Sequence, residues 1–80
     1  MTLKRALNPI PDEVLEALLK RRLLGAFEAR PPFQRNDYLG WIARARRDET
    51  RRKRLEQMLD ELEDGDVYMK MRWKPPKQAS

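Results

Sequence analysis

The sequence predicts an all-α fold: a small bundle of three to four short helices with an extended C-terminal tail. Apolar residues recur at helical spacing along most of the chain, and prolines and glycines stand where helices begin or end. At 80 residues the chain is long enough for one domain. We therefore expect a flexible lead at 1–8, a helical domain at 9–65 and a basic tail at 66–80.

Two helices in the second half of the chain carry the clearest pattern. In the later one, apolar residues fall at i, i+3, i+4 and i+7, namely Leu55, Met58, Leu59 and Leu62. In the earlier one, at about 32–45, the same spacing is found in Tyr38, Trp41, Ile42 and Ala45. We expect these stripes to pack together from antiparallel helices, with Trp41 in the core.

Charge and glycine set the ends of these helices. Acidic residues suit the first turn of a helix, so the acids beginning at Asp48 predict a break near Arg47 and Asp48. Gly65 follows the last apolar position and can take the left-handed conformation that closes a helix. Gly40 lies inside the earlier helix, where glycine costs about 1 kcal/mol relative to alanine. We expect a close neighbour at Gly40, the segment around Phe27.

The chain before residue 32 predicts one or two further short helices. Pro11 can occupy the first helical position. The apolar side of this helix consists of Val14, Leu15, Leu18 and Leu19. The pattern continues at Leu23, Leu24 and Phe27, in a separate helix or in a kinked continuation through Gly25. Pro31 and Pro32 end it.

The tail changes to a period of two. Val67, Met69, Met71 and Trp73 alternate with Tyr68, Lys70, Arg72 and Lys74. This alternation predicts an extended strand, for which no partner strand is visible upstream. The strand could lie extended against the helices or be partly disordered, pair with a second copy, or add to another protein's sheet. We expect residues 77–80 to be disordered.

Positive charge gathers at the junction of the two main helices. Residues 44–54, which we call the basic corner, contain seven basic and two acidic residues. The basic ones are Arg44, Arg46, Arg47, Arg51, Arg52, Lys53 and Arg54. Such a run is often a solvated face with internal pairing, and here Glu28 or Asp37 could pair with Arg51 or Arg54 and fix how the helices cross. Otherwise the corner binds a phosphate or an acidic partner.

The candidate site residues follow from this second alternative. Arg51 and Arg54 are one helical turn apart and could converge on one anion. The predicted anion-binding or partner-binding set is Arg44, Arg47, Thr50, Arg51 and Arg54. The predicted tail contacts are Tyr68, Lys70, Arg72 and Trp73, an arrangement compatible with stacking on bases and contacting phosphates.

Composition narrows the function classes. The chain has no histidine, which removes the commonest general base and metal ligand, and no cysteine, which removes thiolate metal sites. We therefore expect no enzyme, no cofactor and no metal site. A net charge of +5 favours an acidic protein, an anionic ligand or nucleic acid as partner. The apolar runs are too short for a membrane span, so we expect a cytoplasmic protein. The oligomeric state is left open between a monomer and a homodimer.

The stretch FEARPPFQRNDYLGWIARARRDETRRKRLEQMLDELEDG resembles the YdeI/OmpD-associated family of bacteriocin-protection proteins. The resemblance is carried by Phe27, Glu28, Pro31, Pro32, Tyr38, Trp41, Ile42, Ala45, Glu49, Thr50, Arg51, Arg54 and Leu55. With Pro11, Leu15 and Leu18 it covers about 9–65. Phe33 departs from the serine cap of the family, and Asp48 from its frequent proline. The resemblance implies a small helical domain linked to antimicrobial-peptide tolerance or envelope stress, without a known reaction or ligand.

These observations favour a non-catalytic interaction module that binds an acidic partner through the basic corner. Nucleic-acid binding by the same corner and the tail is the alternative.

Overall fold

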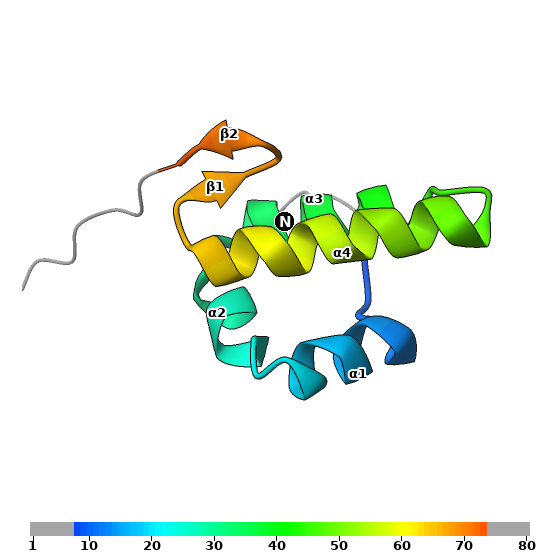
Figure 1. Ribbon diagram of the computed structural model, residues 1–80, viewed down its shortest axis with the longest axis horizontal. Helices are drawn as coiled ribbons and strands as arrows, with labels where there is room; N and C mark the ends of the chain where they lie inside the picture. Colours follow the sequence, from blue (N-terminus) through cyan, green and yellow to red (C-terminus); the bar gives the residue numbers. More distant parts are fainter. Residues whose placement is uncertain (1–7, 74–80) are drawn as a thin grey trace, which may run out of the picture.

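The computed structural model describes residues 8–73, where four helices are followed by a small hairpin (Figure 1). The elements are α1 (Asp12–Lys20), α2 (Leu24–Ala29), α3 (Pro32–Ala43), α4 (Asp48–Asp64), β1 (Val67–Tyr68) and β2 (Met71–Arg72). The helical bundle is confirmed, but the fold is not purely all-α because the two strands form an antiparallel sheet.

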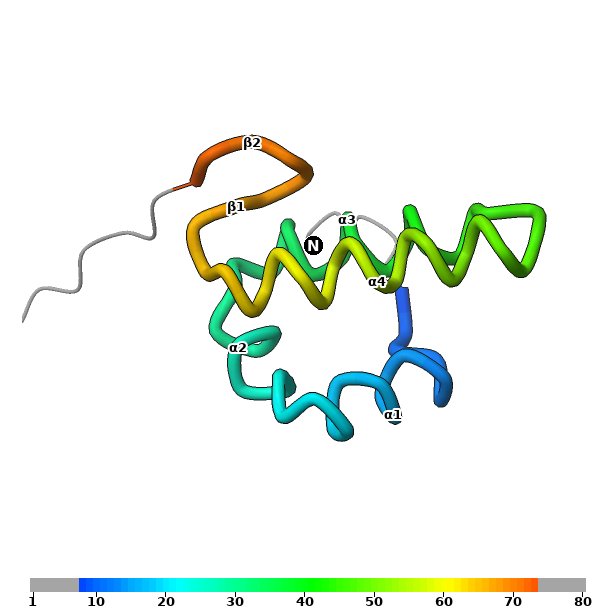
Figure 2. Tube along the Cα trace, viewed as in Figure 1, coloured from blue at the N-terminus to red at the C-terminus, as the bar shows by residue number. Residues whose placement is uncertain are grey.

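The α3 and α4 pair is the centre of the domain (Figure 2). The two helices run antiparallel and are joined by the basic corner, with the predicted break in place. Their buried apolar side chains are Tyr38, Leu39, Ile42, Leu55, Met58, Leu59 and Leu62. Trp41 is partly buried and packs against this core. The predicted seam therefore exists, although Trp41 lies at its margin.

Two short helices cover one side of this pair. Val14 and Leu18 of α1 and Phe27 of α2 are buried, whereas Leu19 is 54% exposed. The helices are separate because α1 ends in a Schellman motif: the N–H of Leu23 donates to the carbonyl of Leu18 over 2.8 Å. Arg22 takes the left-handed conformation in this motif, with φ 58°. Arginine is an unusual residue there, so the sequence pattern pointed to Gly25 instead.

The expected neighbour of Gly40 was wrong. A Cβ at Gly40 would lie 3.0 Å from Nδ2 of Asn8 and 3.1 Å from Nη1 of Arg44, not against the Phe27 segment. Asn8 is held in place by Asn36: its backbone N–H donates to Oδ1 over 2.8 Å, and its Nδ2 donates to Oδ1 over 2.9 Å. The end of the predicted flexible lead is therefore anchored. Residues 1–7 lie outside the described part.

Gly65 ends α4 as predicted, with φ 89°. The chain then turns back on itself, which corrects the prediction of an extended tail. Val67 pairs with Arg72 and Tyr68 with Met71. Met69 and Lys70 form the turn with φ values of 51° and 64°, as in a type I′ hairpin. Such turns favour asparagine and glycine, so Met69 and Lys70 gave no turn signal. Residues 74–80, including the stretch expected to be disordered, lie outside the described part.

Candidate functional site

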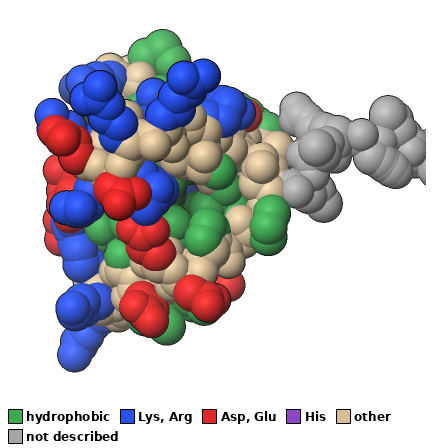
Figure 3. All heavy atoms as spheres, turned by 90° about the vertical axis from the view of Figure 1, so that its right-hand side faces the viewer, with side chains coloured by type: hydrophobic (Ala, Val, Ile, Leu, Met, Phe, Trp, Pro, Cys, Tyr) green, Lys and Arg blue, Asp and Glu red, His purple; other side chains and the backbone are tan. Residues whose placement is uncertain are grey.

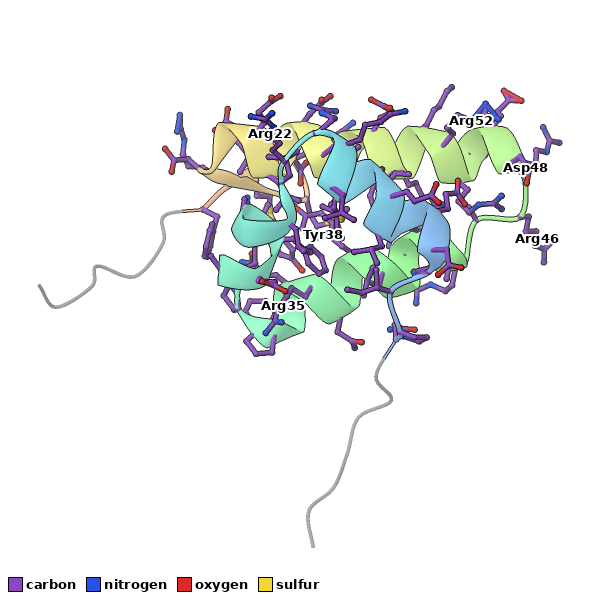
Figure 4. The ribbon with its side chains drawn as sticks, turned by 90° about the horizontal axis from the view of Figure 1, so that it is seen from below. Arg22, Arg35, Tyr38, Arg46, Asp48 and Arg52 are labelled. Carbon is purple, nitrogen blue, oxygen red and sulfur yellow. The ribbon has the colours of Figure 1, made fainter. Side chains whose placement is uncertain are left out.

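The basic corner lies at one end of the molecule, opposite the hairpin (Figure 1). Seen end-on, this side carries many Lys and Arg side chains with Asp and Glu between them (Figure 3). Arg46 and Arg52 point away from the protein (Figure 4). The contacts of the individual side chains divide the corner into two groups.

The Arg51 side chain binds other residues of the same chain. Its Nη2 donates to Oδ1 of Asp48 over 2.8 Å, and its Nε donates to Oε1 of Glu13 over 3.3 Å. The hydrogen bond to Asp48 and the charges of Asp48 and Glu13 raise the pKa of Arg51. Arg51 therefore links α1 to the first turn of α4.

The Arg54 side chain also binds within the chain. Its Nη1 donates to the backbone carbonyl of Trp41 over 2.6 Å. Its guanidinium lies 5.2 Å from the centre of the Trp41 indole ring. Because Trp41 is in the last turn of α3, this bond satisfies a carbonyl that the helix itself leaves unpaired. Arg54 thus fixes the end of α3 to α4.

Arg51 and Arg54 do link the helices, as expected, but the prediction that they pair with Glu28 or Asp37 was wrong. Glu28 is exposed, and Asp37 accepts a hydrogen bond from the Tyr68 hydroxyl over 2.6 Å. Within residues 8–73, Arg51 binds two carboxylates and Arg54 binds a backbone carbonyl, so the two side chains have no common partner there.

Five other basic residues of the corner are exposed and form no ion pair within residues 8–73: Arg44, Arg46, Arg47, Arg52 and Lys53. Thr50 is partly buried in the first turn of α4. The amino end of α4 adds the positive pole of the helix dipole to these cations. The corner is thus a surface that carries five exposed basic side chains without an ion pair in the described part of the chain.

Unlike the exposed basic residues early in α4, three acidic residues late in this helix form ion pairs. Arg21 places its guanidinium across from three carboxylates, at 3.7 Å from Glu56, 3.3 Å from Asp60 and 2.7 Å from Glu63. Three of the acids late in α4 therefore form ion pairs with Arg21, whereas the exposed cations early in α4 form none within the described residues.

A buried polar cluster under the hairpin was missed by the sequence analysis. Glu61 is 5% exposed, and its carboxylate accepts four hydrogen bonds. The donors are the Tyr38 hydroxyl at 2.5 Å, Nε2 of Gln57 at 3.0 Å and the backbone N–H groups of Met69 at 2.7 Å and Lys70 at 2.8 Å. The last two bonds place the carboxylate inside the hairpin turn. A signal existed, since Glu61 follows the core residue Met58 by three positions on α4.

The predicted tail contacts fall into two pairs. Tyr68 packs edge-on against Tyr38 with ring centres 5.5 Å apart, and against Phe33 at 6.0 Å. Trp73 lies 4.6 Å from the buried guanidinium of Arg30. Lys70 and Arg72 are exposed. The aromatic pair is therefore occupied by contacts within the chain.

Both tyrosines are held in their neutral form. Burial, together with the hydrogen bond to Glu61, raises the pKa of the Tyr38 hydroxyl above its ordinary value. Burial and the hydrogen bond to Asp37 raise the pKa of Tyr68 in the same way. These shifts follow from packing and from proximity to carboxylates.

Within residues 8–73, no acidic cluster has the grouping of ligands that a metal ion needs. In the same segment, none of the helices combines the length and apolar character that crossing a lipid bilayer requires.

Comparison with known proteins gives one match. The family model described as "Bacteriocin-protection, YdeI or OmpD-Associated" matches residues 9–65. The matched region includes all four helices and ends at Gly65, so the hairpin lies beyond it. No curated protein and no solved structure matches the chain.

Proposed function

The chain belongs to the bacteriocin-protection family, YdeI or OmpD-associated, and from this premise we propose that it is a non-catalytic interaction module. Its pathway is bacterial stress or antimicrobial-peptide tolerance, and its compartment is the cytoplasm. The partner is an acidic protein, which the basic corner contacts.

The observation that supports this proposal is that the basic residues of the corner fall into two groups with different contacts. Arg51 and Arg54 hold helices together, whereas the other five basic residues are exposed and form no ion pair in the described residues. Like charges at this density repel one another, and an anion bound among them would relieve the repulsion. Exposed guanidinium groups suit carboxylates because they donate two parallel hydrogen bonds.

Nucleic-acid binding has less support as the alternative. It would use Tyr68 and Trp73 for stacking, but both rings contact residues of the same chain. They also lie at the opposite end of α4, whose 17 residues span about 25 Å. The exposed corner cations and the tail aromatics therefore do not form one continuous strip.

A charge-reversal experiment tests the proposal. The corner variant is Arg46→Glu/Arg47→Glu/Lys53→Glu, and the control is Lys20→Glu/Arg22→Glu/Arg72→Glu, in which all the replaced residues are likewise exposed. Both variants undergo the same change in net charge. We expect partners captured from a bacterial extract to be lost from the corner variant and kept by the control. Equal capture by both folded variants would refute the assigned surface.

A salt titration with duplex DNA separates the two functions. A nucleic-acid-binding protein loses affinity steeply as salt is raised. Tight binding to DNA at low salt that is abolished by the corner variant and weakened by Arg72→Glu in the tail would favour the alternative.

A further inference from the structure

Arg30 is a buried cation whose side-chain hydrogen bonds both go to uncharged acceptors. It is 4% exposed. Its Nη1 donates to Oε1 of Gln34 and its Nη2 donates to the backbone carbonyl of Glu61, both over 3.0 Å. No carboxylate oxygen of residues 8–73 lies within ion-pair distance of it. An arginine cannot give up its proton in a protein, so the charge remains.

An unused donor lies beside this cation. The Gln34 side chain is fully buried, and its Nε2 has no hydrogen-bond partner in the described structure. Its other end is the oxygen that accepts from Arg30. Burying a donor or a charge without an acceptor is unfavourable. The buried charge of Arg30 therefore favours the binding of an anion, and the Gln34 amide, which contacts Arg30, can report on it.

A small hollow opens next to Arg30, with a volume of about 200 Å³. Its lining residues are Ala26, Ala29, Arg30, Leu62, Gly65 and Trp73. The Trp73 indole, which lies against the guanidinium, forms one wall. The other side chains of the wall are aliphatic and small. The hollow thus combines apolar walls with one permanent positive charge.

We infer that this hollow, the Arg30 pocket, binds a small carboxylate with a short apolar group. The carboxylate accepts from the N–H groups of Arg30 that Gln34 and Glu61 leave unused. The apolar group lies between Trp73 and the alanines of α2. The pocket is separate from the basic corner, since α2 and the hairpin lie at the other end of α4 (Figure 1). The inference therefore goes beyond the proposed function.

The ligand could be a free short-chain acid or the C-terminus of a peptide. Isobutyrate represents the first source and N-acetylvaline the second. Isobutyramide has the shape of isobutyrate without the charge and serves as the control. The protein is the full chain, followed by amide and indole NMR signals. Its two tryptophans give one indole reporter in the pocket, Trp73, and one outside it, Trp41.

We expect saturable shifts of the Trp73 indole and of the Gln34 side-chain amide with isobutyrate or N-acetylvaline, and no shift of Trp41. Whichever of the two acids binds more tightly identifies the source. The Arg30→Gln variant should bind at least tenfold more weakly. Because that variant could fail to fold, Ala29→Leu provides a second test: it fills the hollow without removing the charge and should also abolish the shifts.

Three results would overturn the inference. The first is an equal response to isobutyrate and isobutyramide, since it would mean that the charge plays no part. The second is unchanged binding by folded Ala29→Leu or Arg30→Gln. The third is no saturable shift of Trp73 with either acid, which would show that the hollow holds only water.

Discussion

Replacing Glu61 by glutamine changes one atom in the cluster that holds the hairpin. The carboxylate accepts hydrogen bonds from four donors, whereas the glutamine side chain presents one oxygen and one NH₂ group. The NH₂ group cannot accept, so about two of the bonds are lost and their donors stay partly buried. A bond to a charged group contributes roughly 1.5–3 kcal/mol, and we take the lower value because glutamine keeps the shape. The expected loss is about 3 kcal/mol.

That loss is large for a domain of this size. Stability for 80 residues is roughly 4–12 kcal/mol. Each kcal/mol shifts Tm by about 4–8 °C in such a domain, so Tm should fall by about 12–24 °C. Thermal and urea unfolding followed by circular dichroism measures the change. Amide NMR of Met69 and Lys70 reports the hairpin, and both signals should move most.

The matched control is Glu56→Gln, the same substitution five residues earlier on α4. Glu56 is exposed and its contact to Arg21 is 3.7 Å, so its loss should change stability by at most about 0.5 kcal/mol. The reasoning is refuted if Glu61→Gln unfolds within about 0.5 kcal/mol of the wild type while the Met69 and Lys70 amides stay in place.

Three further predictions follow from the same contacts. Lys70→Gly should raise the unfolding free energy by about 0.5–1 kcal/mol, because φ of 64° suits glycine, and urea unfolding measures it. Arg54→Ala should lower it by about 1–2 kcal/mol, because the bond to the Trp41 carbonyl and the contact with the indole ring are lost. The raised pKa values of Tyr38 and Tyr68 stabilise the fold fully below the unfolded value of 10.0, and this stability should be lost as pH rises above it.

Each of these has an outcome that contradicts it. For the turn, Arg72→Gly is the control, and a gain from that variant as well would show that relief of the left-handed strain is not the cause. For the corner, Arg52→Ala should leave stability within about 0.5 kcal/mol, so an equal loss from both variants would remove the special role of Arg54. For the tyrosines, phenolate absorbance that appears at pH 10 in the folded protein would contradict the raised pKa values.

The helical part of the fold could be predicted because its signals are local. The stripe Leu55, Met58, Leu59 and Leu62 is buried, and Gly65 ends α4 where its missing Cβ permits the left-handed conformation. The boundary between α1 and α2 could not be predicted in the same way. It depends on Arg22 in a conformation that arginine rarely adopts, stabilised by backbone hydrogen bonds to the end of α1.

The hairpin was missed for a related reason. The period of two predicted one extended strand, but the chain reverses at Met69 and Lys70. This turn is stabilised by the Glu61 carboxylate, which lies eight and nine residues earlier. Turn rules consider the turn residues alone, and neither Met69 nor Lys70 favours positive φ. The sequence offered one indication: the Glu61 carboxylate lies on the core-facing side of α4, three positions after Met58.

The candidate site could be predicted as a cluster but not by the role of each residue. Density of charge identified the basic corner from the sequence. Tertiary contacts decide which basic side chains bind other parts of the chain. Arg51 binds Glu13 on α1, 38 positions earlier, and Arg54 binds a backbone carbonyl at the end of α3. Sequence spacing suggested that Arg51 and Arg54 meet at one anion, whereas their three-dimensional partners separate them.

An NMR titration with polyglutamate, a soluble acidic chain, tests the central claim most directly. We predict that the backbone amide signals of residues 44–53 shift, whereas the side-chain signals of Arg51 and Arg54 and the signals of the hairpin stay in place. Shifts centred on the hairpin, or none at low salt, would contradict the assignment of the basic corner as the docking surface.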